Sequence, residues 1–103
     1  MVIGDVIRGS IGFEGVLVSD DLAMRALTGE PGALAVAAIA AGCDVALHCT
    51  GVLAETAAVL GAVPAVSEAG AARMAAARAM VAARRTMLDE QALAAEREML
   101  LAC

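Results

Sequence analysis

The 103-residue sequence contains no lysine, tryptophan or tyrosine, and Phe13 is its only aromatic residue. The lack of lysine excludes P-loop, Schiff-base and receiver-domain sites, each of which uses a lysine side chain. The near-absence of aromatic side chains removes the platforms on which nucleic-acid bases stack. The net charge of −5, without any basic cluster, also argues against a nucleic-acid partner, because phosphate binding needs clustered cations.

Disorder and a membrane span are also excluded by composition. Apolar residues make up 61% of the chain and charged residues 18%. The charge-free run 31–43 is too short to cross the ~30 Å hydrocarbon core of a bilayer. The three cysteines are an odd number and do not make a disulfide framework, and no signal peptide precedes the first element. We therefore expect a reduced, cytoplasmic chain with no membrane partner.

The apolar pattern predicts an α/β unit with two parallel strands. Residues 16–18 form a short apolar run typical of a strand buried on both faces, and 19–21 leave the sheet. A helix over 33–41, begun by Pro31 or Gly32 and closed by Gly42, leads to a second strand at 45–49. This helix is apolar on every side, so more than one neighbour should cover it. Strand, helix and strand in this order predict a parallel pair.

Further helices are expected on either side of this unit. Residues 2–7 have the spacing of the last turns of a helix, stopped by Gly9 and Gly12. Because no cap precedes this segment, we expect the chain to be a piece of a larger domain. The other expected helices are 22–27, one or two turns long; 53–60; a helix capped by Ser67 and running to about Leu88; and a final helix capped by Asp89.

Asp20 and Asp21 stand at the carboxyl end of the first strand, where loops line the site in parallel α/β folds. A carboxylate there can act on an oxocarbenium-like centre or bind a hard cation. The alternative is that the pair caps a helix beginning at Leu22. Neighbours in an extended chain point in opposite directions, so one acid is expected to act while the other caps.

His48 is the only histidine and lies beside Cys49 at the end of the second strand. Together with Cys43 these residues could suggest a zinc or thiol module. However, zinc sites usually show ligands paired two to four residues apart, so we expect no metal and no other cofactor. We expect His48 to be a packed histidine at the rim of the sheet, with the option that it lines the same pocket as Asp20.

Two sequence blocks resemble the family 3 glycoside hydrolases. Ile7-Arg8 is followed by IGFEGVLVSDDLAM and then by AAIAAGCDVALHC, in the order and spacing of that family. The similarity is closer to the bacterial β-N-acetylhexosaminidases of peptidoglycan recycling, and it covers residues 2 to about 50. Beyond Gly51 the chain is compatible with the closing helices of the family.

The resemblance implies that residues 1–103 are one partial domain, the C-terminal portion of a TIM (β/α)8 barrel. GVLVSDD would be its seventh strand and DVALHC its eighth. It implies that Asp20 is the nucleophile of a retaining mechanism on terminal β-linked N-acetylglucosamine, within a muropeptide substrate. Asp21 would hold the loop, and Met24 would lie near the sugar pocket.

The same resemblance shows what the sequence lacks. The family's general acid lies in an upstream loop that has no counterpart here, and His48 does not take its place. We therefore expect the isolated chain to be inactive. The alternative is a non-catalytic interaction or structural module that self-associates through exposed sheet edges.

Overall fold

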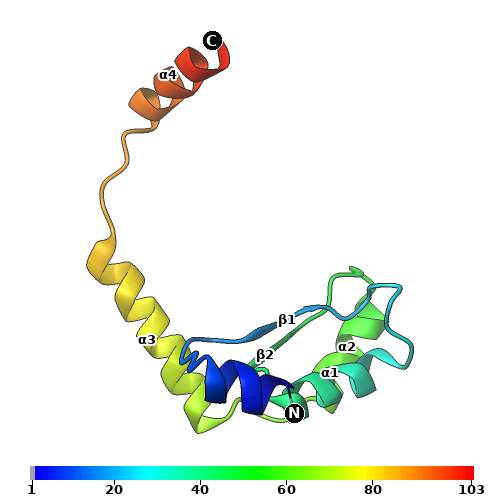
Figure 1. The fold of residues 1–103 in the computed structure, drawn as a ribbon. Coiled ribbons are helices and arrows are strands. Elements are labelled where there is room, and N and C mark those ends of the chain that lie inside the picture. The colour runs from blue at the N-terminus through cyan, green and yellow to red at the C-terminus, as the bar shows by residue number, and fades with distance from the viewer. Residues whose placement is uncertain (1) are drawn as a thin grey trace.

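A computed structural model describes residues 2–103. Its elements in chain order are the π-helix η1 (Val2–Ser10), β1 (Val18–Asp21), α1 (Pro31–Ala41), β2 (Val45–Leu47), α2 (Leu53–Ala62), α3 (Glu68–Arg84) and α4 (Glu90–Leu101). The two strands lie side by side, with α1 and α2 along one end of the pair and η1 and the start of α3 at the other (Figure 1).

β1 and β2 are parallel, as the sequence predicts. Val18 pairs with Val45 and Asp21 with Leu47, with an irregularity between these two pairs. The first strand begins later than expected, so both aspartates lie within it. Just before β1, the carbonyl oxygen of Leu17 accepts hydrogen bonds from Asp44 N–H (2.8 Å) and Val45 N–H (3.2 Å). These two bonds lie outside the regular ladder, so the strand begins one residue later, at Val18.

The helix α1 packs along α2, and this contact forms the small core. Of the described residues, the buried apolar ones are Leu22, Ala35 and Val59. Gly32 lets the helices approach closely, because a Cβ on it would lie 3.0 Å from Ala62 Cβ and 3.1 Å from the Ala58 carbonyl oxygen. Pro31 opens α1, and Gly42, with φ at 117°, closes it in the left-handed conformation as expected.

Two expectations about this region are wrong in detail. Residues 22–27 form successive turns rather than a helix, with Met24 N–H bonded to Asp21 O and Leu27 N–H to Met24 O. The strand residue Val18 is 49% exposed instead of buried on both faces. The helix α1 contacts both α2 and β2, in agreement with the expectation of more than one neighbour, and Val36 is nevertheless 39% exposed.

The N-terminal segment is helical, but it runs through Gly9 to Ser10 as a π-helix, and Gly12 (φ 71°) lies beyond its end. The helix α2 likewise continues through Gly61, past the expected end at Leu60. In both places a single glycine is compatible with continued helix, so it is a weaker terminator than the sequence pattern suggests.

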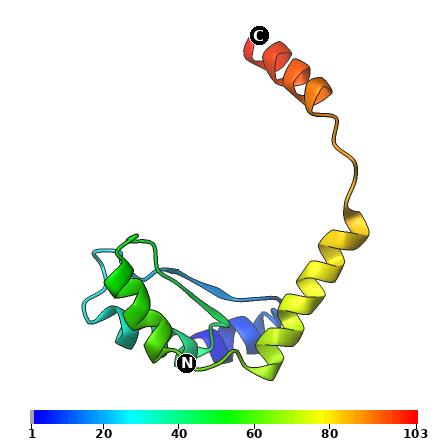
Figure 2. The same ribbon diagram turned by 180° about the vertical axis from the view of Figure 1, so that it is seen from behind.

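The C-terminal third extends away from the strand pair. The helix α3 begins beside the amino ends of the strands and projects outward, and an extended linker then leads to α4, which stands apart in both views (Figures 1 and 2). The Ser67 and Asp89 side chains cap α3 and α4 as predicted, by accepting from backbone N–H groups of the first turn. The helix α3 ends at Arg84, before the expected Leu88. Across residues 2–103, no helix combines the length and apolarity that a bilayer crossing requires.

The close contact at Gly32 predicts a test of the core. We expect Gly32→Val to lower the free energy of unfolding by roughly 1–3 kcal/mol, because the new side chain meets backbone and Ala62 and forces α1 from α2. Gly61→Ala is the matched control: no atom lies within 4 Å of its added Cβ, and it should raise stability by about 0.5–1 kcal/mol. Urea unfolding followed by circular dichroism measures both, and equal stability of the two variants would contradict the packing.

Candidate functional site

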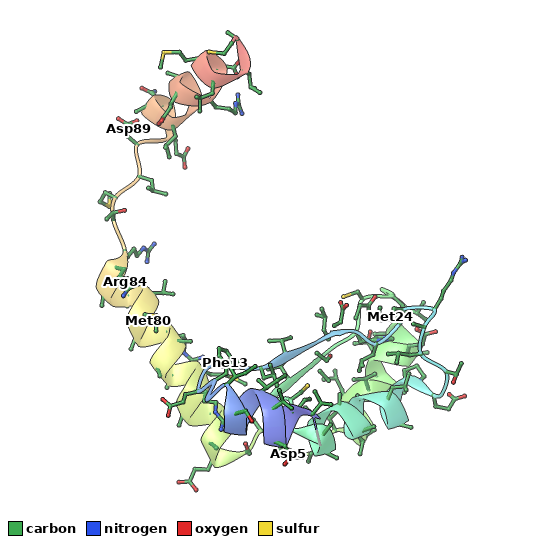
Figure 3. All side chains as sticks on the ribbon, viewed as in Figure 1. Asp5, Phe13, Met24, Met80, Arg84 and Asp89 are labelled. Carbon is green, nitrogen blue, oxygen red and sulfur yellow. The ribbon has the colours of Figure 1, made fainter. Side chains whose placement is uncertain are left out.

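The carboxyl ends of β1 and β2 meet at one edge of the strand pair and carry the residues that the sequence singled out. Asp20 and Asp21 end β1, and His48 directly follows β2. Met24 lies on the turns after β1, at the end of the molecule remote from α3 (Figure 3). Loops at this edge line the site in parallel α/β folds.

Asp20 is exposed and lies on a fixed stretch of backbone. Its Oδ1 accepts from Asp21 N–H at 2.8 Å, and its carbonyl accepts from the Ser19 hydroxyl at 2.8 Å. The Ser19 Oγ in turn accepts from Leu47 N–H at 2.9 Å, which links the residue before Asp20 to β2. An exposed carboxylate held in this way is available to a molecule that approaches the edge.

Asp21 has a different environment. Its Oδ1 accepts from Ala23 N–H (3.0 Å) and from Cys49 N–H (3.1 Å). Leu22 N–H also donates to Leu47 O at 2.9 Å. Asp21 therefore fastens the turn after β1 to the segment after β2. Asp21 caps a turn instead of a helix, and the two acids differ in their surroundings, because the Asp21 side chain bridges two loops whereas that of Asp20 bonds only to the next backbone N–H.

His48 is nearly buried, with its side chain 6% exposed. Its Nε2 lies 3.0 Å from Thr50 Oγ1 and 3.3 Å from Glu55 Oε2, so it links the exit of β2 to the first turn of α2. Its Nδ1 is buried, with no hydrogen-bond partner among the described residues. A packed histidine at the rim of the sheet matches this arrangement.

A pocket of about 190 Å³ lies between the turns after β1 and the start of α2. Its lining is Leu22, Ala23, Met24, Leu27, Gly29, Pro31, Leu34, His48, Thr50 and Glu55. The fold thus brings Met24 and His48 together. Asp20 is not among the lining residues, so the suggestion that His48 shares a pocket with Asp20 is wrong for this cavity.

The cysteines do not gather with His48. Across residues 2–103, no group of three or more histidine, cysteine, aspartate or glutamate side chains is placed to hold a metal ion. Burial, with a contribution from the neighbouring Asp44 carboxylate, raises the pKa of the Cys43 thiol, which favours the unreactive protonated form.

The most highly connected polar group was not singled out from the sequence. Asp44, whose side chain is 4% exposed, lies at the opposite, amino end of the strands. Its Oδ2 accepts from Arg8 Nη2 at 2.8 Å and from Leu17 N–H at 2.9 Å. Its Oδ1 accepts from Arg73 Nη1 at 2.7 Å. The sequence signal was available: Arg73 interrupts an otherwise apolar stripe of α3, as a cation with a buried partner does.

This cluster joins three parts of the chain around one carboxylate. Arg8 also donates from Nη1 to the carbonyls of Phe13 (2.8 Å) and Gly15 (2.7 Å). Burial alone would raise the pKa of Asp44, but the Leu17 N–H and the two guanidinium groups outweigh burial and hold that pKa below its ordinary value. Asp44 is therefore an ionised structural group, distinct from the acids at the carboxyl edge.

Comparison with known proteins gives a family for most of the chain. Residues 1–87 match the model of the glycosyl hydrolase family 3 N-terminal domain. The chain is 53% identical over 47 residues to a beta-hexosaminidase of Aromatoleum aromaticum, and 52% identical over 50 residues to one of Alkalilimnicola ehrlichii. These alignments cover 44% and 46% of this chain but only 13% and 14% of the relatives, so the chain aligns with about one seventh of their length. No solved structure matches the chain.

The lowered pKa of Asp44 predicts acid sensitivity with a definite sign. Because the folded pKa lies below the unfolded value of about 3.9, the stabilisation is complete above about pH 5 and is lost as the pH falls through the folded pKa. Asp44→Asn should be less stable by roughly 3 kcal/mol near neutral pH and should lose less on acidification.

Urea unfolding between about pH 7 and pH 3, followed by circular dichroism, measures this effect. Glu14→Gln, which removes an exposed carboxylate, is the control and should keep the acid dependence of the original chain. An Asp44→Asn variant with unchanged stability and unchanged acid dependence would show that the cluster does not support the fold.

Proposed function

This chain belongs to glycosyl hydrolase family 3, and on that premise we propose that it supplies the nucleophile strand of a β-N-acetylhexosaminidase. Residues 1–103 would be one partial domain, the C-terminal part of a (β/α)8 catalytic barrel. In this proposal β1 and β2 are consecutive barrel strands, and their carboxyl ends face the substrate. Their parallel pairing and the helix between them support the assignment.

The single observation that carries the proposal is the exposed Asp20 carboxylate at the carboxyl edge. In a retaining mechanism this carboxylate attacks the anomeric carbon, the glycosidic bond breaks as the leaving oxygen takes a proton from a general acid outside this chain, and a glycosyl–enzyme ester forms. Water then hydrolyses the ester and returns the carboxylate. Asp21, fixed by Ala23 and Cys49 N–H groups, keeps the neighbouring backbone in place while Asp20 reacts.

The proposed substrate is a terminal β-linked N-acetylglucosamine residue, as in the muropeptides released during peptidoglycan recycling in the cytoplasm. The beta-hexosaminidase names of the relatives support the sugar class. Met24 is 40% exposed on the turns that follow β1 and is one of the residues that line the pocket, from which it would contact the sugar. No cofactor enters this mechanism, because the Asp20 carboxylate, a general acid–base group from the upstream motif of the family and water complete it.

A second candidate function is that of an interaction module without catalysis. It is favoured by apolar strand residues left open, with Val18 49% and Leu47 41% exposed. Two strands with unpaired outer edges can add a strand from another chain or self-associate. The two candidates differ at Asp20, which has a role in hydrolysis and none in edge pairing.

A chimaera tests the role of Asp20. The 47-residue aligned segment of the Aromatoleum aromaticum beta-hexosaminidase would be replaced by the matching residues of this chain. We expect the chimaera to hydrolyse an aryl N-acetyl-β-glucosaminide, and Asp20→Asn within it to lower kcat on the order of 10⁴-fold, because the covalent step is lost.

Glu30→Gln is the matched control for that experiment. Glu30 is an exposed carboxylate that precedes α1 without forming a side-chain cap, so its loss should leave kcat unchanged. A folded, active chimaera that keeps its activity after Asp20→Asn would refute the assignment. Thermal unfolding of each variant shows that a loss of activity is not a loss of fold.

The chain by itself is expected not to hydrolyse the same substrate. The general acid of the family lies in an upstream motif that this sequence does not contain, and acid–base assistance alone is worth roughly 10²–10⁴-fold in rate. The measurement is turnover by the purified 103-residue chain beside its Asp20→Ala variant. Turnover that disappears in the variant would mean that the chain assembles a working site alone.

A further inference from the structure

The strand β1 contains one more residue than β2 over the stretch where the two strands pair. Val18 lies opposite Val45. The next pair is Asp21 with Leu47, and the ladder is irregular between the two pairs. An unbroken ladder would place Asp20 opposite Leu47, because each strand would advance by two residues from the first pair. The extra residue makes a β-bulge directly before the carboxyl edge, and a bulge beside an active site redirects a side chain.

The Ser19 hydroxyl lies at this bulge and bridges the two strands. Its Oγ accepts from Leu47 N–H at 2.9 Å and donates to the Asp20 carbonyl at 2.8 Å. In a parallel ladder, a bonded residue uses its N–H for the residue before its opposite partner and its C=O for the residue after it. For Leu47 these are the Asp20 carbonyl and the Leu22 N–H. The bond to Leu22 is regular, at 2.9 Å, and the Ser19 hydroxyl lies within hydrogen-bond distance of both partners of the other bond.

Serine is suited to this position because one hydroxyl can accept from one group while it donates to another. Both bonds of the half-buried Ser19 go to backbone groups, so they do not depend on the rotamer of any other side chain. Their combined effect is to fasten the carbonyl of Asp20 to β2.

The same peptide group also orients the Asp20 carboxylate. The carbonyl of Asp20 and the N–H of Asp21 belong to one planar peptide unit, so fixing the carbonyl fixes the direction of the N–H. That N–H donates to Asp20 Oδ1 at 2.8 Å. Among the described residues no donor bonds the other oxygen, Oδ2. The Ser19 hydroxyl is therefore linked to the carboxylate through one rigid group, and Oδ2 is left open.

We propose that Ser19 is a positioning residue for the Asp20 nucleophile and acts through the peptide group between Asp20 and Asp21. The inference rests on the proposed function, in which the Asp20 carboxylate attacks the anomeric carbon. Because Oδ1 is occupied by the Asp21 N–H, Oδ2 is the oxygen that attacks. Ser19 contacts neither the sugar nor the reacting atoms, and its role is to fix the direction from which Oδ2 approaches.

The unmodified chain offers a test that does not require activity. We expect Ser19→Ala to free the peptide group, so that the NMR couplings between Hα and the two Hβ protons of Asp20 converge toward the values of a freely rotating side chain. Ser19→Thr keeps the hydroxyl and should keep the original couplings. Ser10→Ala is the matched control, because its hydroxyl donates to the Asp5 carbonyl in η1, at the other end of the strands.

The chimaera described above tests the consequence for catalysis. Ser19→Ala should lower kcat/KM for an aryl N-acetyl-β-glucosaminide roughly 10–100-fold, because a small misplacement of the attacking atom is costly. The inhibition constant of N-acetylglucosamine should stay within about twofold, because sugar binding does not require the attacking oxygen. The loss should be equal for a dinitrophenyl and a less activated phenyl leaving group, whereas a displaced general acid would slow the poorer leaving group more.

Two further variants show whether the hydroxyl itself is responsible. Ser19→Thr should recover most of the activity that Ser19→Ala loses, since a β-branched residue fits a strand and retains the hydroxyl. Thr28→Val removes an exposed hydroxyl from the segment between β1 and α1 and should leave kcat/KM unchanged. Thermal unfolding of each variant shows that the fold is retained.

The outcomes separate this proposal from the one on which it rests. Activity that survives Asp20→Asn would refute the nucleophile, and the positioning role with it. An inactive Asp20→Asn beside a folded Ser19→Ala of full kcat/KM would refute the positioning role alone. A loss that Ser19→Thr does not recover, or that Thr28→Val shares, would also overturn it. If the chimaera does not fold, the Asp20 couplings decide, and couplings that Ser19→Ala leaves unchanged would overturn the proposal.

Discussion

The buried carboxylate of Asp44 is the interaction on which the arrangement of this chain depends. It accepts from Arg8 on η1, Arg73 on α3 and the backbone N–H of Leu17 just before β1. A buried ion cluster contributes little net stability compared with apolar packing, but removing one member leaves an unpaired charge that is costly. Its effect is therefore to fix position: η1 and α3 are fastened to the amino ends of the strands, in one register. The candidate site lies at the carboxyl ends of the strands, so the side chains of this cluster do not occupy it.

The ion cluster and the proposed site lie at opposite ends of the strand pair, and the two neighbouring aspartates show a similar division. Asp21 is engaged by two backbone N–H groups from separate loops, whereas the Asp20 carboxylate beside it is exposed. Strand alternation separates the two side chains, so one residue can hold the loop without occupying the space that a substrate would use. The His48–Glu55 contact adds a link from the same edge to α2.

Local signals in the sequence predict where helices begin and end, but they do not predict which distant residues form hydrogen bonds with one another. Pro31, Gly42, Ser67 and Asp89 mark helix ends because each acts through its own backbone or its first turn. The turns at 22–27 were not predictable from propensity, because hydrogen bonds to Asp21 and Leu47 decide that backbone. Asp44 was likewise missed, since its partners lie 36 and 29 residues away and only the fold brings them together.

The exposed apolar residues fall into two sets that lie in different parts of the chain. The open faces of the strands and of α1, where Val18 and Val36 are exposed, belong to the region that matches the family model. The sequence predicts that more than one neighbour covers α1, and in the proposed barrel adjacent strands and helices would do so. The second set, which includes Val81 and Leu93, lies on the outer half of α3 and on α4, away from the strand pair (Figure 1). Neighbouring units of the proposed barrel would cover the first set, whereas the second set lies on helices that project beyond the strand pair (Figures 1 and 2).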